Sequence, residues 1–395
     1  MATPTQLRRS LWVLVAAATL TVMAGAILGP VVPQIQSELG VSGIAAGLII
    51  TTHGGVIVLG SPIVGTLVDR IGPRQPFVGG LVVYGLGGGA GLFVDSYLPL
   101  LASRVLLGAG TAAVYTSVTV LIYQLYEGQQ MERALGLRSG ANSAGAAVWP
   151  LVGGAAGTVA WNLPFGVYLV ALPLGLLAAL TIPDVDATAA QVGGGGRTDS
   201  GDGLAGVLAV FRDQPVLPLV YLLYFGTNVL IYVIVVYYPQ FLGGVGVTSS
   251  LQISFYLGAN GAAGGVTAAV YDRLVQRVER VTLVLGALVL WSVALLSTLA
   301  VETPLGAAVP VVLFGLGIGL AFPSSFAWVE KFAPEDRQGQ YSAYLASFGY
   351  TGQFLSPILF GVVLVFGDVG WVFVAAGTLT AISALAFGSR VLRPA

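Results

Sequence analysis

Residues 65–74 read Gly-Thr-Leu-Val-Asp-Arg-Ile-Gly-Pro-Arg, a short charged stretch between two long apolar runs. Residues 272–277, Asp-Arg-Leu-Val-Gln-Arg, repeat the D-R-x-x-x-R pattern of residues 69–74 at a separation of 203 residues. A second pair, Glu132-Arg133 and Asp336-Arg337, recurs at a separation of 204 residues. Matching charges at a nearly constant offset indicate two related halves, an arrangement that places a substrate site between them.

The composition around these stretches is that of a membrane protein. Of the 395 residues, 56% are hydrophobic and 8% are charged, against about 25% charged in soluble domains. A crossing helix needs about 20 apolar residues. Twelve segments qualify, and the sequence therefore predicts an all-α polytopic protein with two six-helix bundles. The segments are 11–35, 43–68, 76–94, 98–123, 135–158, 163–182, 215–241, 251–271, 281–301, 305–330, 341–366 and 371–389.

Several function classes are disfavoured by composition. The formal net charge of −1 leaves no basic surface for nucleic acid. The chain has no cysteine and one histidine, so neither a metal site nor a cofactor is expected. There is no G-x-x-x-x-G-K-[ST] motif for direct use of ATP. An enzyme is not expected, because a membrane-embedded one would need clustered histidine or acidic residues at depth.

The charged residues also predict topology. The loops expected outside carry Glu38, Asp95, Glu302 and Asp368 but no lysine or arginine. The positive-inside rule then places both termini in the cytoplasm. We expect a six-helix bundle over 1–182, a flexible acidic cytoplasmic linker over 183–214 and a second bundle over 215–395.

The loop motif and the twelve spans resemble the major facilitator superfamily (MFS), and within it the twelve-helix drug:proton antiporters. The family signature G-x-x-x-D-R-x-G-x-R is present in full. The resemblance implies a latch that holds the two halves together in the outward-facing state; a positively charged loop with a turn is the simpler alternative. The latch residues would be Gly65, Asp69, Arg70, Gly72 and Arg74.

A second resemblance is the helix-4 pattern R-x-x-x-G-x-G over residues 104–110. It implies that Arg104 takes part in proton transfer or anion binding, whereas an arginine at this depth could also snorkel to the headgroups. His53 is the titratable group expected at mid-depth. We predict a proton or substrate relay from Arg104 and His53, with a hydrogen-bonded interhelical histidine as the alternative for His53.

The third resemblance is the helix-5 motif G-x8-G-x3-G-P-x2-G-G, which is associated with exporters. It departs from the family where a tryptophan replaces a glycine. Small residues on one face of the fifth span, 135–158, predict close packing against the eighth span, 251–271. The motif residues are Gly136, Gly145, Trp149, Pro150, Gly153 and Gly154.

Polar residues at mid-depth in the second half suit an amphipathic organic substrate. Each could instead be a hydrogen bond between helices. The expected cavity residues are Asn228, Tyr232, Asn260, Tyr350 and Gln353. No aspartate or glutamate lies deep in any span, which is the main misfit to proton coupling.

We therefore predict an alternating-access secondary transporter that exports hydrophobic or amphipathic compounds by proton antiport. The alternative is an MFS facilitator or importer of a small metabolite, such as a sugar or organic anion, without proton coupling. The expected partners are a small-molecule substrate, protons and the lipid bilayer. The expected form is a monomeric multi-pass protein of the plasma membrane.

Overall fold

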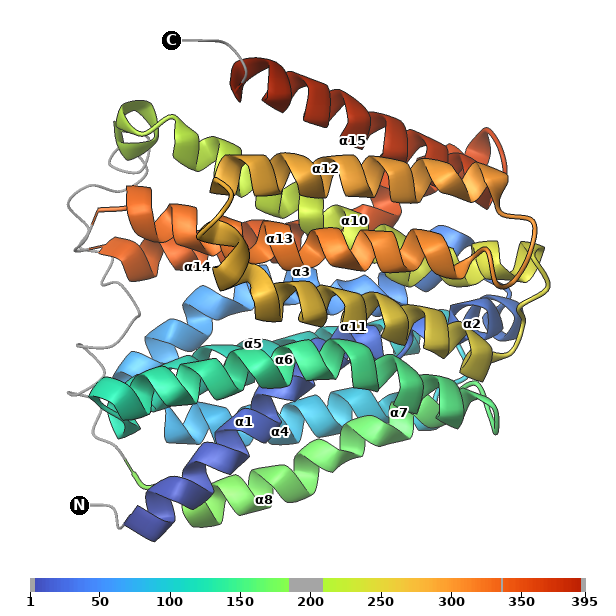
Figure 1. The fold of residues 1–395 in the computed structure, drawn as a ribbon. Coiled ribbons are helices and arrows are strands. Elements are labelled where there is room, and N and C mark those ends of the chain that lie inside the picture. Colours follow the sequence, from blue (N-terminus) through green and yellow to red (C-terminus); the bar gives the residue numbers. More distant parts are fainter. Residues whose placement is uncertain (1–3, 185–208, 335–336, 392–395) are drawn as a thin grey trace.

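The structure is a computed structural model that describes residues 4–184, 209–334 and 337–391. All regular elements in these ranges are helices, and most run roughly along one axis of an elongated bundle (Figure 1). In chain order they are α1 (Pro4–Ala26), η1 (Gly29–Val31), α2 (Val32–Leu39), α3 (Gly43–Ile71), α4 (Arg74–Gly89), η2 (Ala90–Leu92), α5 (Tyr97–Leu125), α6 (Gly128–Gly157), α7 (Leu163–Val167), η3 (Tyr168–Val170), α8 (Ala171–Thr181), α10 (Val216–Gly244), α11 (Ser250–Val275), α12 (Arg280–Leu296), η5 (Ser297–Ala300), α13 (Ala308–Phe332), α14 (Gln338–Gly361), η7 (Val362–Val365) and α15 (Val369–Val391).

Helical structure coincides with every one of the twelve predicted spans. Helices satisfy their own backbone hydrogen bonds, which is why they can cross lipid. Within the described residues, nine helices are long and apolar enough to do so by length and composition. The predicted spans that do not reach this threshold are α4, which has 16 residues, and the more polar α6 and α11.

The two halves of the chain meet along two helix pairs, α6 with α11 and α3 with α14. Helix α6 covers all but the last residue of the predicted span 135–158, and α11 contains the predicted span 251–271. Their contact is therefore the one expected from the sequence. A Cβ atom on Gly154 would overlap the side chain of Ser254, and one on Gly261 would come within 2.6 Å of the Ala146 carbonyl oxygen. The missing side chains let the two helix backbones approach closely, as small residues do in membrane bundles.

Contacts between the halves are concentrated at one end of the bundle. Near that end, a Cβ atom on Gly47 would lie 2.6 Å from Pro357, and one on Gly55 would lie 3.0 Å from the Phe354 ring. Helix α1 begins at the opposite end, where α15 also finishes (Figure 1). Towards that end, which we call the terminal end, a Cβ atom on Gly136 or Gly265 would meet nothing within 4 Å. The halves therefore separate towards the terminal end.

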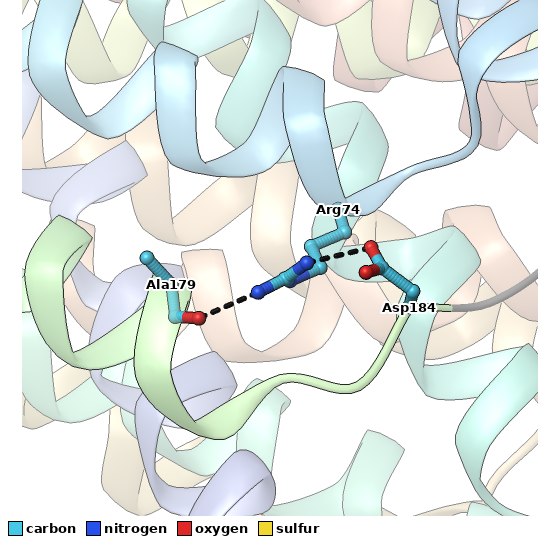
Figure 2. Close-up of polar contacts among 3 residues, drawn as sticks. All are labelled: Arg74, Ala179 and Asp184. Atoms are coloured by element: carbon cyan, nitrogen blue, oxygen red, sulfur yellow. Dashed lines mark hydrogen bonds and ion pairs between the residues drawn. The ribbon is translucent and has the colours of Figure 1, made fainter.

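The segment expected to be a linker, 183–214, is only partly described. Residues 185–208 lie outside the described residues. On one side of them, Arg74 Nη1 donates a hydrogen bond of 2.6 Å to Asp184 Oδ1 and forms an ion pair with it (Figure 2). On the other side, residues 209–213 are helical, and the Phe211 ring packs on Tyr221. The described parts of this segment are thus attached to the bundle at both sides.

Candidate functional site

The loop between α3 and α4 carries the predicted latch residues. Helix α3 ends at Ile71, and the next residue, Gly72, has a φ of 78°, in the left-handed region that favours glycine. Arg74 begins α4 and, besides binding Asp184, donates through Nη2 to the Ala179 carbonyl oxygen at 2.6 Å (Figure 2). Arg74 therefore fastens α4 to the end of α8 within the first half of the chain.

The other residues of the motif reach neither the second half nor a partner. Asp69 and Arg70 are exposed, and neither makes a hydrogen bond or ion pair with the described residues. Gly65 has nothing within 4 Å of where a Cβ atom would stand. At this end of the bundle, these three residues therefore make no contact between the halves in this structure.

Because Asp69 is unpaired here, Asp69→Asn should separate stability from transport. We expect the melting temperature of the purified protein to stay within about 2 °C of wild type, as for most surface changes. Transport should fall at least about tenfold, since a charge-assisted hydrogen bond of about 1.5–3 kcal/mol would be lost from the state that closes this end. Thermal unfolding and uptake into proteoliposomes measure the two effects. Wild-type transport in Asp69→Asn would rule out the latch.

Arg104 of α5 is buried within the first half, with 1% of its surface exposed. Its Nη2 donates to the carbonyl oxygens of Gly87 at 3.1 Å and Gly88 at 2.8 Å, in the last turn of α4. The guanidinium carbon also lies 4.9 Å from the centre of the Phe165 ring and 5.2 Å from that of Tyr168. Arg104 thus extends inward rather than to the headgroups, and its positive charge lies where a helix C-terminus favours a cation.

His53 of α3 lies where the two halves meet. Its Nδ1 is 2.6 Å from the Ile50 carbonyl oxygen one turn earlier, so Nδ1 acts as the donor. The ring centre is 6.5 Å from that of Tyr232 on α10. Glycines make room for this pair: a Cβ atom on Gly25 would overlap the Tyr232 hydroxyl, and one on Gly108 would lie 3.0 Å from the His53 backbone. His53 and Tyr232, predicted separately, are thus brought together across the interface.

The other predicted cavity residues divide into two places. Gln353 Nε2 donates to Asn228 Oδ1 at 3.0 Å, which joins α14 to α10. Tyr350, one turn from Gln353, packs edge-on against Tyr115 of α5 with ring centres 5.6 Å apart. Asn260 lies elsewhere, between α11 and α13, and its Oδ1 is buried without a hydrogen-bond partner.

The helix-5 motif packs α6 against two neighbours. A Cβ atom on Gly153 would overlap the Ile27 carbonyl oxygen after α1, whereas Gly154 faces α11. Trp149 takes the place of a motif glycine without blocking either approach, because its indole Nε1 donates to the Thr19 carbonyl oxygen at 3.0 Å. Pro150 is buried inside α6, and Gly136 has nothing within 4 Å.

Helix α1 is held by side chains from three other helical elements of its half. All three donate to carbonyl oxygens in the C-terminal part of α1, where the sequence has no acidic residue. These bonds are Tyr84 to Leu20 at 2.6 Å, Tyr168 to Ala24 at 2.9 Å and Trp149 to Thr19 at 3.0 Å.

Sequence reasoning missed the roles of Arg138, Tyr115 and Thr119. Arg138 Nη1 donates to Thr119 Oγ1 at 2.8 Å, and its guanidinium carbon lies 5.4 Å from the centre of the Tyr115 ring. Tyr115 and Thr119 are four residues apart, and residues at this spacing share a helix face. This spacing was a signal available in the sequence. Among the described residues no cluster of histidine or acidic side chains could hold a metal ion.

Comparison with known sequences identifies the family. The sequence model of the Major Facilitator Superfamily matches residues 14–357. The chain belongs to this family, and it is a multi-pass membrane transporter rather than an enzyme.

Similar proteins include exporters. The chain is 31% identical over 150 residues to the bacillibactin exporter of Bacillus subtilis (strain 168), covering 36% of this chain and 37% of that protein. It is 34% identical over 154 residues to multidrug resistance protein 1 of the same organism, covering 38% of each. The matches thus span less than half of these relatives.

Solved transporter structures share the fold over nearly the whole chain. The crystal structure of the nucleoside transporter NupG superposes with a TM-score of 0.80 at 13% identity, covering 98% of this chain and all of that one (100%). At this identity the match establishes the MFS fold and not the substrate.

Proposed function

We propose that this transporter exports hydrophobic or amphipathic organic compounds by alternating access, in exchange for protons. The observation that carries the proposal is the group of aromatic and weakly polar side chains that meet between the halves: His53, Tyr115, Tyr232 and Tyr350. Such a group of side chains suits an amphipathic molecule, for which apolar contacts supply affinity and a few polar groups supply orientation. The exporters among the similar proteins support the same direction of transport.

The same proposal includes the site of proton exchange. His53 is buried and contacts Tyr232 across the interface. Its Nε2 makes no hydrogen bond with the described residues and is free to accept a proton. A histidine that gains a proton on one side and loses it when substrate binds provides the competition that antiport requires.

Substitution of His53 tests the coupling. Wild-type protein in liposomes loaded with a pH-sensitive dye should move protons when a gradient of a transported compound, found by thermal-shift screening, is imposed. His53→Gln should retain at least about a tenth of substrate flux but lose the proton movement. Thr52→Val, on the same helix, serves as the control and should keep both. Proton movement that survives in His53→Gln rejects the histidine, and none in wild type rejects antiport.

The second candidate is uncoupled transport of a small metabolite, in either direction. The absence of an acidic side chain at mid-depth in α1 favours it. In the same liposomes it predicts flux without proton movement.

We place the protein in the plasma membrane as a monomer, with both termini and residues 183–214 on the cytoplasmic side and a six-helix bundle on each side of that segment.

A further inference from the structure

Arg138 is a cation inside the bundle that has no anionic partner. It is half-buried and lies ten residues after Gly128, the first residue of α6, which corresponds to about 15 Å along the helix. Among the described residues the one ion pair joins Arg74 to Asp184, so no carboxylate neutralises Arg138. The apolar run of this helix begins near residue 135, so Arg138 lies inside that run, where an arginine is costly and is a candidate functional residue.

The surroundings hold the guanidinium in place while leaving most of its donors free. Nη1 binds Thr119 Oγ1, and Thr119 itself donates to the Tyr115 carbonyl oxygen at 3.1 Å. The guanidinium carbon lies 5.4 Å from the centre of the Tyr115 ring, a cation–π contact that favours a fixed position. Nε and Nη2 make no hydrogen bond with the described residues, so Arg138 can present two donors to a ligand.

An aromatic surface continues from Arg138 to the other half of the chain. Tyr115 packs edge-on against Tyr350 at an interplanar angle of 87°. Arg138, Tyr115 and Tyr350 are all half-buried rather than enclosed. A cation and two aromatic rings, none of them fully buried, are thus brought together by α5, α6 and α14.

We infer that Arg138, Tyr115 and Tyr350 form a subsite for an amphipathic substrate that carries a carboxylate or phenolate next to an aromatic ring. The anion binds the free donors of Arg138, and the ring packs on the two tyrosines. This inference rests on the proposed function for its substrate class and narrows that class to anionic aromatic molecules. Because Tyr115 and Tyr350 belong to different halves, a bound ring contacts both moving parts of the transporter.

Three probes that share a naphthalene ring system and differ in charge test the subsite: 1-naphthoate, 1-naphthylmethanol and 1-naphthylmethylammonium. Calorimetric titration of the full chain in detergent should show naphthoate binding about tenfold more tightly than the neutral alcohol, the effect of one charge-assisted contact. The cation should bind most weakly. Arg138→Gln should remove the preference for the anion, whereas Tyr115→Leu should weaken all three probes by similar factors.

Arg133→Gln is the matched control, because Arg133 is an exposed arginine on the same helix. It should keep the preference for naphthoate. Arg138→Lys keeps the charge and should retain part of the preference, which guards against misfolding of Arg138→Gln. An equal affinity of wild type for naphthoate and the alcohol, no binding of either, or an unchanged preference in Arg138→Gln overturns the subsite.

The same proteins in liposomes separate this inference from the proposed function. Charge-selective binding without any export of substrate would reject export and leave the subsite standing. Export that is indifferent to Arg138→Gln, together with unselective binding, would reject the subsite and leave export standing.

Discussion

Gly153→Leu should prevent the transporter from folding stably. A Cβ atom at this position would overlap the Ile27 carbonyl oxygen, and backbone cannot turn aside as a side chain can. Overpacking in a well-packed interior costs about 1–3 kcal/mol, and a backbone clash belongs at the upper end or beyond. We expect the melting temperature in detergent to fall by about 8 °C or more, or the yield of monodisperse protein to collapse.

Gly140→Leu is the matched control on the same helix. A Cβ atom there would meet nothing within 4 Å, and Gly140 is exposed. Leucine also has a helix propensity about 1 kcal/mol better than glycine, so this variant should unfold at the wild-type temperature or slightly above it. Equal melting temperatures for Gly153→Leu and wild type would show that α6 does not approach Ile27 so closely.

The helical spans could be predicted because a membrane imposes one length and one composition on every crossing helix. Helix boundaries were predicted less well. The apolar run of helix 5 begins near residue 135, whereas α6 begins at Gly128. Its first turns contain Glu132 and Arg133, because a helix can continue into the polar region beyond the apolar run. Arg138, three residues into this apolar run, therefore lies ten residues after the start of α6.

Side-chain directions in the site could not be predicted from depth alone. Tyr232 and Asn260 both lie at mid-depth in the second half, yet Tyr232 meets His53 whereas Asn260 lies against Gly315 of α13. Which neighbour a residue meets depends on the rotation of its helix, and a helix that is apolar on all sides carries no periodic signal of that rotation. Trp149 shows the same limit, because its bond to the Thr19 carbonyl oxygen depends on where α1 lies.

The contacts of Arg104 favour a positioning role over direct contact with substrate. Its Nη2 binds two carbonyl oxygens in the last turn of α4, and its guanidinium lies beside Phe165 and Tyr168. Tyr168 in turn binds the Ala24 carbonyl oxygen of α1. Arg104 therefore ties α4 and α5 to the tyrosine that holds α1, and its loss should disturb the first half as a unit.

Arg104→Leu should lower the free energy of unfolding by about 2–4 kcal/mol. The carbonyl oxygens of Gly87 and Gly88 would lose a charged donor in a buried place, at about 1–3 kcal/mol each, offset in part because no cation remains buried. Arg104→Lys keeps the charge but loses the planar fork, so an intermediate value is expected. Unfolding in detergent with increasing denaturant measures the change. The control is Arg133→Leu, at an exposed position of α6, which should stay within about 0.5 kcal/mol of wild type.

Transport per folded molecule then separates the two roles of Arg104. A positioning residue loses transport in step with stability, whereas a relay residue loses transport in Arg104→Leu even where folding is retained. Full stability in Arg104→Leu would mean that the ends of α4 and α5 do not depend on this arginine.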